Sequence, residues 1–200
     1  MIKQFSNYDN TQAYTGGEEK LPRGGYVCKI TGTRIEEGNY GQRVKIAFDI
    51  AEGDYAGYFQ AKFDRNTNED KKWSGTYQLY VPKDDGSRED EWTKRSFKTF
   101  TNALEDSNTG YHFDWDESKF KGKLVGIIFN WREYDFNGQT GFTPNAAQAA
   151  SVKDIREGKY KIPDDKFLKK KNSKPLTAAD QALLDSFVNI PAGAEEEPPF

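Results

Sequence analysis

Basic and aromatic side chains alternate with apolar residues along two neighbouring stretches of the chain. In residues 43–50 the alternating cations are Arg43 and Lys45, and in residues 58–64 the alternating side chains are Tyr58 and Lys62. A period of two predicts strands with one buried face, so we expect these four side chains on the opposite, outer face. Cations that bind phosphates, beside rings that stack on bases, suit a flexible anionic polymer that carries flat bases.

The same residue types continue in the flanking segments. Arg132 and two rings precede Asn137-Gly138, which predicts a hairpin turn, and Tyr40 falls in the predicted loop after the first strand. A ring stacked on a base contributes about 1–3 kcal/mol, although we expect about half of the rings, including Trp131, to fill the core. The candidate nucleic-acid-binding residues are Lys29, Tyr40, Arg43, Lys45, Tyr58, Lys62, Arg65, Lys71, Lys72, Trp73, Arg132, Tyr134 and Phe136.

Residues that commonly perform catalysis are scarce. His112 is the only histidine and Cys28 the only cysteine, which argues against His-based metal sites, most general-base schemes and an intramolecular disulfide. We expect His112 on the surface, Cys28 as a buried inert thiol, and the loop carboxylates of Asp114 and Asp116 in solvent. No P-loop or G-x-S-x-G motif is present. We therefore predict a non-enzymatic protein without catalytic residues, bound metal or cofactor.

Composition narrows the class of protein. The 200 residues are 35% hydrophobic and 14% aromatic, which favours a small β-rich domain with some unpacked chain. A net charge of −3 argues against a simple basic-patch binder, but a local groove can be basic in an acidic chain. No apolar run is long enough for a membrane helix, and no signal-peptide core is evident. We expect no membrane association and a cytoplasmic location.

The predicted order of elements is informative about the fold. Strands are expected over residues 26–35, 43–50 and 58–64, followed by an extended segment over 73–81. A helix would bury Trp92, Phe97, Phe100, Ala103 and Leu104. A strong strand over 122–134 and a return strand after the hairpin, continuing to 155, complete the set. Three strands, a helix and two strands is the order of an OB-fold, a five-stranded Greek-key barrel. A β-sandwich would not need the helix, and an SH3-like barrel is the structural alternative.

The chain divides into three regions by composition. Residues 1–20 are predicted to be a flexible arm, 21–160 the OB-fold domain, and 161–200 a linker, a short amphipathic helix over 176–188 and an acidic tail. The end of the tail combines an acidic run with a ring beside the terminal carboxylate, which suits docking to a basic and apolar pocket. The candidate partner-docking residues are Glu195, Glu196, Glu197, Pro199 and Phe200.

The chain resembles known proteins in two places. Its acidic end with Pro199-Phe200 is similar to the C-terminal tip of bacterial single-stranded-DNA-binding proteins, which docks replication and repair enzymes, although Pro198 replaces an isoleucine. The domain resembles a family of single-stranded-DNA-binding proteins from phages and mobile elements. The stretches that carry this resemblance are residues 21–26, 53–57, 105–108 with 111–115, 121–126 and 159–163.

The resemblance implies an OB-fold and sequence-independent binding of single-stranded DNA in phage or mobile-element replication or recombination. It also implies that the cytoplasm is that of a bacterial host cell. It also implies recruitment of replication or recombination proteins by the C-terminal tip. Two other functions fit the residues: a β-barrel that binds carbohydrate or another ligand on aromatic platforms, and a protein-interaction scaffold. The oligomeric state stays open, and a homo-oligomer is one of the options.

Overall fold

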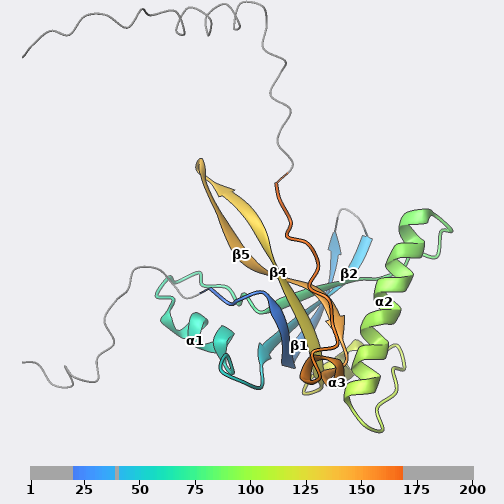
Figure 1. Ribbon diagram of the computed structural model, residues 1–200. Coiled ribbons are helices and arrows are strands. Elements are labelled where there is room, and N and C mark those ends of the chain that lie inside the picture. The colour runs from blue at the N-terminus through green and yellow to red at the C-terminus, as the bar shows by residue number, and fades with distance from the viewer. Residues whose placement is uncertain (1–19, 39–40, 169–200) are drawn as a thin grey trace, which may run out of the picture. The chain divides into compact units, whose positions relative to one another are not determined.

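The computed structural model describes residues 20–38 and 41–168, and a five-stranded antiparallel sheet is its central element. The strand order is β3-β2-β1-β4-β5, so consecutive pairs β1–β2, β2–β3 and β4–β5 are neighbours and β1 also pairs with β4 (Figure 1). The strands are β1 (Gly24–Gly38), β2 (Gly41–Ile50), β3 (Thr76–Tyr80), β4 (Leu124–Phe136) and β5 (Gln139–Ala150).

Four helical elements surround the sheet: α1 (Tyr58–Arg65), α2 (Arg88–Ser107), the 3-10 turn η2 (Glu117–Phe120) and α3 (Val152–Arg156). The predicted helix between the third and fourth strands is α2, which packs against β3, β4 and β5. Ser87 caps it, accepting a hydrogen bond from the backbone N–H of Asp90 (3.1 Å). Its Phe97, Phe100 and Leu104 are buried, but Trp92 is 63% exposed, so the prediction of a shared apolar face was wrong for Trp92.

The core lies on one face of β2. Val44, Ile46, Phe48 and Ile50 are all buried, which confirms the alternation predicted for this stretch. Cys28 on β1 is completely buried, as predicted, and burial raises the pKa of its thiol far above its usual range. A thiol in this environment stays protonated and is a poor nucleophile.

Residues 58–64 form helix α1, so the prediction of a third strand there was wrong. Gly57 reverses the chain with a left-handed backbone (φ 73°), and the Asp49 carboxylate then accepts hydrogen bonds from the N–H groups of Phe59 (2.9 Å) and Gln60 (3.0 Å). This cap comes from β2 and satisfies N–H groups of the first helical turn. Phe59 packs into the core, whereas Ala61 is exposed.

The third strand of the sheet is instead β3, within the extended segment predicted over 73–81. It pairs with β2, and its side chains alternate: Leu79 is buried, while Gln78 and Tyr80 are exposed. The sheet thus keeps five strands because an extended segment replaces the expected third strand.

The hairpin after β4 forms at the predicted Asn137-Gly138 turn, where both residues have positive φ (52° and 78°). The return strand β5 passes through Pro144, which an edge strand tolerates because one of its sides needs no backbone donors. It ends at Ala150. The expected continuation over 151–155 was wrong, because the Ser151 hydroxyl accepts from the Asp154 N–H (3.0 Å) and starts α3.

Residues after α3 also belong to the packed unit, which extends to Phe167. The backbone of Lys166 pairs with β4, donating to the carbonyl of Trp131 and accepting from the N–H of Glu133 (both 2.8 Å). Trp131 is half-buried, and its indole N–H donates to the carbonyl of Leu21 (3.4 Å). None of the helices in the described ranges is both long and apolar enough to cross a bilayer.

Candidate nucleic-acid interface

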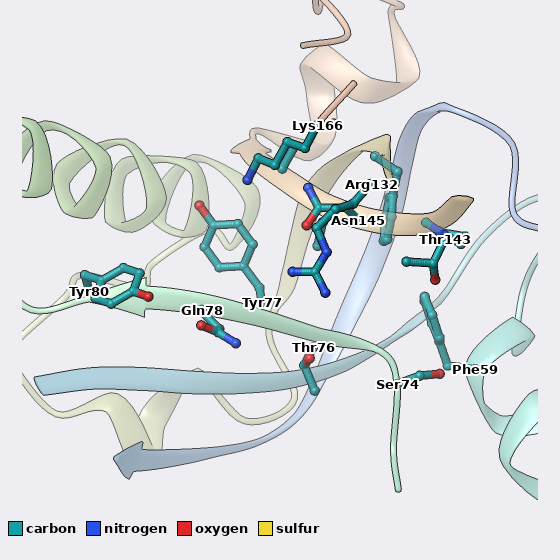
Figure 2. A pocket seen from close by; sticks show the side chains of 14 residues that line it. Phe59, Ser74, Thr76, Tyr77, Gln78, Tyr80, Arg132, Thr143, Asn145 and Lys166 are labelled. Atoms are coloured by element: carbon teal, nitrogen blue, oxygen red, sulfur yellow. The ribbon is translucent and has the colours of Figure 1, made fainter. Parts of the chain in front are cut away.

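A cleft of about 460 Å³ separates β3 from β5, the two end strands of the sheet. Figure 2 shows Thr76, Gln78 and Tyr80 of β3 along one side, with Arg132 and Lys166 across from them. The lining also includes Phe59, Ser74, Tyr77, Phe129, Thr143, Pro144, Asn145, Ala146 and Ala147. The cleft is therefore a polar groove with aromatic rings in its wall and two cations on one side.

The two cations of the cleft are held in place by different means. Arg132 comes from β4, where it lies opposite Thr143 in the hairpin. Lys166 is fixed by its backbone pairing with β4 and by the neighbouring Asp165, whose carboxylate accepts from the N–H of Trp131 (2.9 Å) and from the Arg23 guanidinium (3.1 Å). Both side chains are exposed, and neither forms an ion pair with another described residue.

Two further hollows adjoin the cleft. The first is lined by Lys62, Phe63, Arg65, Asn66, Thr67, Asn68, Lys72 and Ser74 at the end of α1. The second is lined by Gly32, Thr33, Arg34, Lys45, Ala47, Lys72, Trp73 and Thr76 on the outer side of β1 and β2. Ser74 and Thr76 each also line the cleft, and Lys72 lines both hollows. We call the cleft and the two hollows together the basic surface.

The sign of the charge distinguishes the basic surface from other hollows of the domain. Within the described residues its lining contains no aspartate or glutamate, although the whole chain has a net charge of −3. Two hollows elsewhere contain carboxylates: Asp85, Glu89 and Asp90 in one, Asp106 and Asp154 in the other. Seven basic side chains line the basic surface: Arg34, Lys45, Lys62, Arg65, Lys72, Arg132 and Lys166.

Aromatic rings extend the interface along the β4–β5 hairpin, which projects beyond the rest of the sheet (Figure 1). Arg132, Tyr134 and Phe136 occupy every second position of β4 and therefore share one face of the strand. Arg132 also lines the cleft. Tyr134 is 43% exposed and Phe136 is 70% exposed. The hairpin therefore carries two accessible rings outward from the cleft on the same face.

One carboxylate lies at the margin of the basic surface. Glu36 binds the Arg34 guanidinium, accepts from Nε and Nη2 of Arg43 (3.2 and 3.0 Å), and lies 3.9 Å from Nζ of Lys45. Hydrogen bonds from Arg34 and Arg43 hold the pKa of Glu36 below its usual range, so it is ionised at neutral pH. Its charge offsets part of the positive charge of the three neighbouring cations.

Some predicted residues are engaged in the fold. The Tyr58 hydroxyl accepts from the N–H of Leu21 (3.2 Å), and the ring is half-buried against the core. Lys71 lies over the ring of Phe63, with Nζ 4.5 Å from the ring centroid. The indole N–H of Trp73 donates to the carbonyls of Phe48 (3.2 Å) and Gly75 (3.0 Å), which leaves only part of this ring at the surface.

The structure brings together about half of the predicted set. Lys45, Lys62, Arg65, Lys72, Trp73 and Arg132 line the basic surface, and Tyr134 and Phe136 continue it. Lys29, Arg43, Tyr58 and Lys71 lie outside its lining, and the shared strand face expected for Tyr58 and Lys62 was wrong because both lie on α1. The remaining predicted residues lie outside the described ranges: Tyr40, Glu195, Glu196, Glu197, Pro199 and Phe200.

Sequence reasoning missed Lys166, Arg34, Tyr77 and Tyr80. Tyr80 occupies an exposed position of β3, within the extended segment predicted over 73–81, so the pattern of that segment was a usable signal. No signal in the sequence marked Lys166, because its position depends on long-range contacts of Asp165 with Trp131 and Arg23.

Asp114 and Asp116, the loop carboxylates expected in solvent, both lie beside a lysine, and Asp114 is exposed. Lys119 forms an ion pair with Asp114, and its Nζ lies 3.7 Å from the Asp116 carboxylate. Within residues 20–38 and 41–168, no group of three or more His, Cys, Asp or Glu side chains has the arrangement of a metal site. His112 is exposed, as predicted.

Comparison of the chain with known protein families finds no match, and comparison with curated proteins finds none of significant similarity.

Proposed function

We propose that this protein binds single-stranded DNA without sequence preference, through phosphate contacts and base stacking on the basic surface. The observation that carries the proposal is the sign of the charge: seven cations and no described carboxylate line three contiguous hollows of an acidic chain. A continuous positive groove attracts a polyanion even when the net charge of the protein is negative.

The topology supports assigning an OB-fold to this domain. Three strands form a meander, β1 also pairs with β4, β4 pairs with β5, and α2 lies between β3 and β4. In OB-folds, the face of strands 2 and 3 and the loops after strands 1 and 4 bind oligonucleotides. The basic surface includes side chains of β2 and β3, and the β4–β5 hairpin extends it.

The side chains available explain the preference for a single strand. Lysine and arginine on the basic surface bind phosphates, which are the same for every sequence. Tyr80, Tyr134 and Phe136 are exposed rings that can stack on bases. A base presents its face to a ring only when it leaves the duplex stack, so stacking favours single strands over duplexes.

The proposed role is DNA replication or recombination of a phage or mobile element. The acidic C-terminal residues 195–197 with Pro199-Phe200 would recruit replication or recombination proteins, while the domain holds the strand. Support for this part comes from the sequence resemblance of the tip and the domain.

The test is fluorescence anisotropy of a labelled oligo-dT of about thirty nucleotides, titrated with the full chain at several salt concentrations. We expect saturable binding, with log K falling by about 0.7 per tenfold rise in salt for each phosphate contact. Duplex DNA of the same length, and mixed-sequence and oligo-dC strands, serve as controls. Binding that ignores salt, or that prefers the duplex, would contradict the proposal and favour another kind of ligand.

The charge of Glu36 is expected to weaken DNA binding. Replacing it by glutamine (Glu36→Gln) frees Arg34, Arg43 and Lys45 for phosphates, so affinity should rise by about threefold to fivefold and the salt dependence should steepen. The titration above measures both. Glu89→Gln, at an exposed position of α2, is the matched control for the change in net charge. Lower affinity of Glu36→Gln would show that Glu36 instead orders the arginines for binding.

A further inference from the structure

Tyr134 and Gly141 face each other across the β4–β5 hairpin. They are directly paired in the register of the two strands, two residues outward from the pair Arg132–Thr143 that lines the cleft. Side chains at directly opposed positions of an antiparallel pair are close neighbours. Whatever occupies position 141 therefore contacts the Tyr134 ring.

The ring occupies the space that a side chain at position 141 would take. A Cβ built on Gly141 would lie 2.7 Å from Oη, 2.8 Å from Cζ and 3.1 Å from Cε1 of Tyr134. A Cβ beside the ring in its own plane would be farther from Cζ, the middle atom, than from both Oη and Cε1. Because Cζ is closer than Cε1, the Cβ would lie out of the ring plane, above the hydroxyl end of the ring. The hydroxyl end of one ring face thus lies over the glycine backbone.

The need for glycine here comes from the ring and not from the backbone. Gly141 is not among the glycines with positive φ, and β5 is extended there, so other residues could adopt the same conformation. A glycine inside a strand often marks a site of close approach. The other side of the ring is not covered in the same way, because Tyr134 is 43% exposed.

We propose that Gly141 is a positioning residue that lays Tyr134 flat against the hairpin, so that its outer face forms a stacking platform for a base. A single-stranded DNA whose phosphates are bound by Arg132 and Lys166 in the cleft would place the base of a following nucleotide on this ring. The proposal rests on the proposed function, and it adds a specific contact and the residue that orients it. A rigid ring loses little conformational freedom when a base stacks on it.

An aromatic ring over a strand glycine also stabilises a hairpin without any ligand. The test must therefore separate contact with DNA from support of the fold. Four variants do this: Tyr134→Ala, Tyr134→Phe, Gly141→Ala, and the double variant with alanine at both positions. Thr140→Ala is the matched control, because Thr140 pairs with Asp135 on the other face of the hairpin.

We expect Tyr134→Ala and Gly141→Ala each to weaken binding of oligo-dT about tenfold, while Thr140→Ala stays within about twofold of the unaltered protein. Tyr134→Phe keeps the ring, so it should lose less affinity than Tyr134→Ala. In the Tyr134→Ala background, Gly141→Ala should cause no further loss, because its effect passes through the ring. Photo-crosslinking to an oligonucleotide that carries 5-iododeoxyuridine should label the peptide containing Tyr134. Circular dichroism and thermal midpoints check that the variants keep the fold.

Each outcome decides the proposal. Unchanged affinity of Tyr134→Ala or Gly141→Ala, in a protein that binds oligo-dT, would overturn the platform and leave the proposed function standing. A further loss from Gly141→Ala in the Tyr134→Ala background would show that Gly141 acts through the fold, which also overturns it. Failure of the unaltered chain to bind single strands would overturn both this inference and the proposed function.

Discussion

Replacing Lys72, Arg132 and Lys166 together by alanine is expected to weaken binding of single-stranded DNA about 100-fold, because each lost phosphate contact costs about fivefold near 0.1 M salt. The slope of log K against log salt should become shallower by about 2. Arg132 and Lys166 line the cleft, and Lys72 lines both adjoining hollows. Together the three cations therefore represent every part of the basic surface. Anisotropy titrations at several salt concentrations measure both quantities.

A second triple variant keeps the same net charge and serves as the control. Lys98, Lys121 and Lys153 are exposed, form no ion pair with another described residue and line no part of the basic surface. Their replacement by alanine should therefore reduce affinity less than about fivefold. Equal losses in the two triple variants would mean that binding follows net charge alone. That result would refute a localised interface.

Replacing Phe59 by alanine is expected to lower the free energy of unfolding by about 3–5 kcal/mol, the usual cost of deleting a buried phenylalanine. The side chain is 4% exposed, and its ring contacts Phe48 edge-on (5.5 Å between centroids) and stacks on Phe129 (6.1 Å). It is the only fully buried residue of α1, so it anchors the helix that carries Lys62 and Arg65. Urea unfolding, with the midpoint and the slope fitted separately, measures the loss.

Phe167→Ala is the matched control for this truncation, because Phe167 is 68% exposed. Its unfolding free energy should change by less than about 0.5 kcal/mol. A loss below about 1 kcal/mol for Phe59→Ala would contradict the packing of α1 on the sheet.

Local patterns in the sequence predicted the elements whose structure depends on near neighbours. The hairpin at Asn137-Gly138 is one example, because its turn depends on the residues at the turn itself. The alternation of β2 was predicted for the same reason.

Where distant residues determine the structure, the predictions from local sequence patterns were wrong. In residues 58–64, Phe59 and Phe63 fit a strand period and also the i, i+4 spacing of a helix. The helix forms there with a cap from Asp49, ten residues before Phe59 in the chain, and periodicity cannot register such a contact. Lys166 lines the cleft because of a similar long-range contact, between Asp165 and β4. No local pattern marks this cation in the sequence, so it was not predicted.

The cleft between β3 and β5 also has a consequence for contacts between copies of the chain. Strands at the ends of a sheet expose unpaired backbone groups, and such edges promote aggregation by pairing with strands of other molecules. Here β3 has only five residues, and β5 is interrupted by Pro144, which has no N–H to donate. Arg132 and Lys166 beside these edges would repel the same cations of a second copy. The features that leave the cleft open to a polyanion therefore also disfavour edge-to-edge polymerisation.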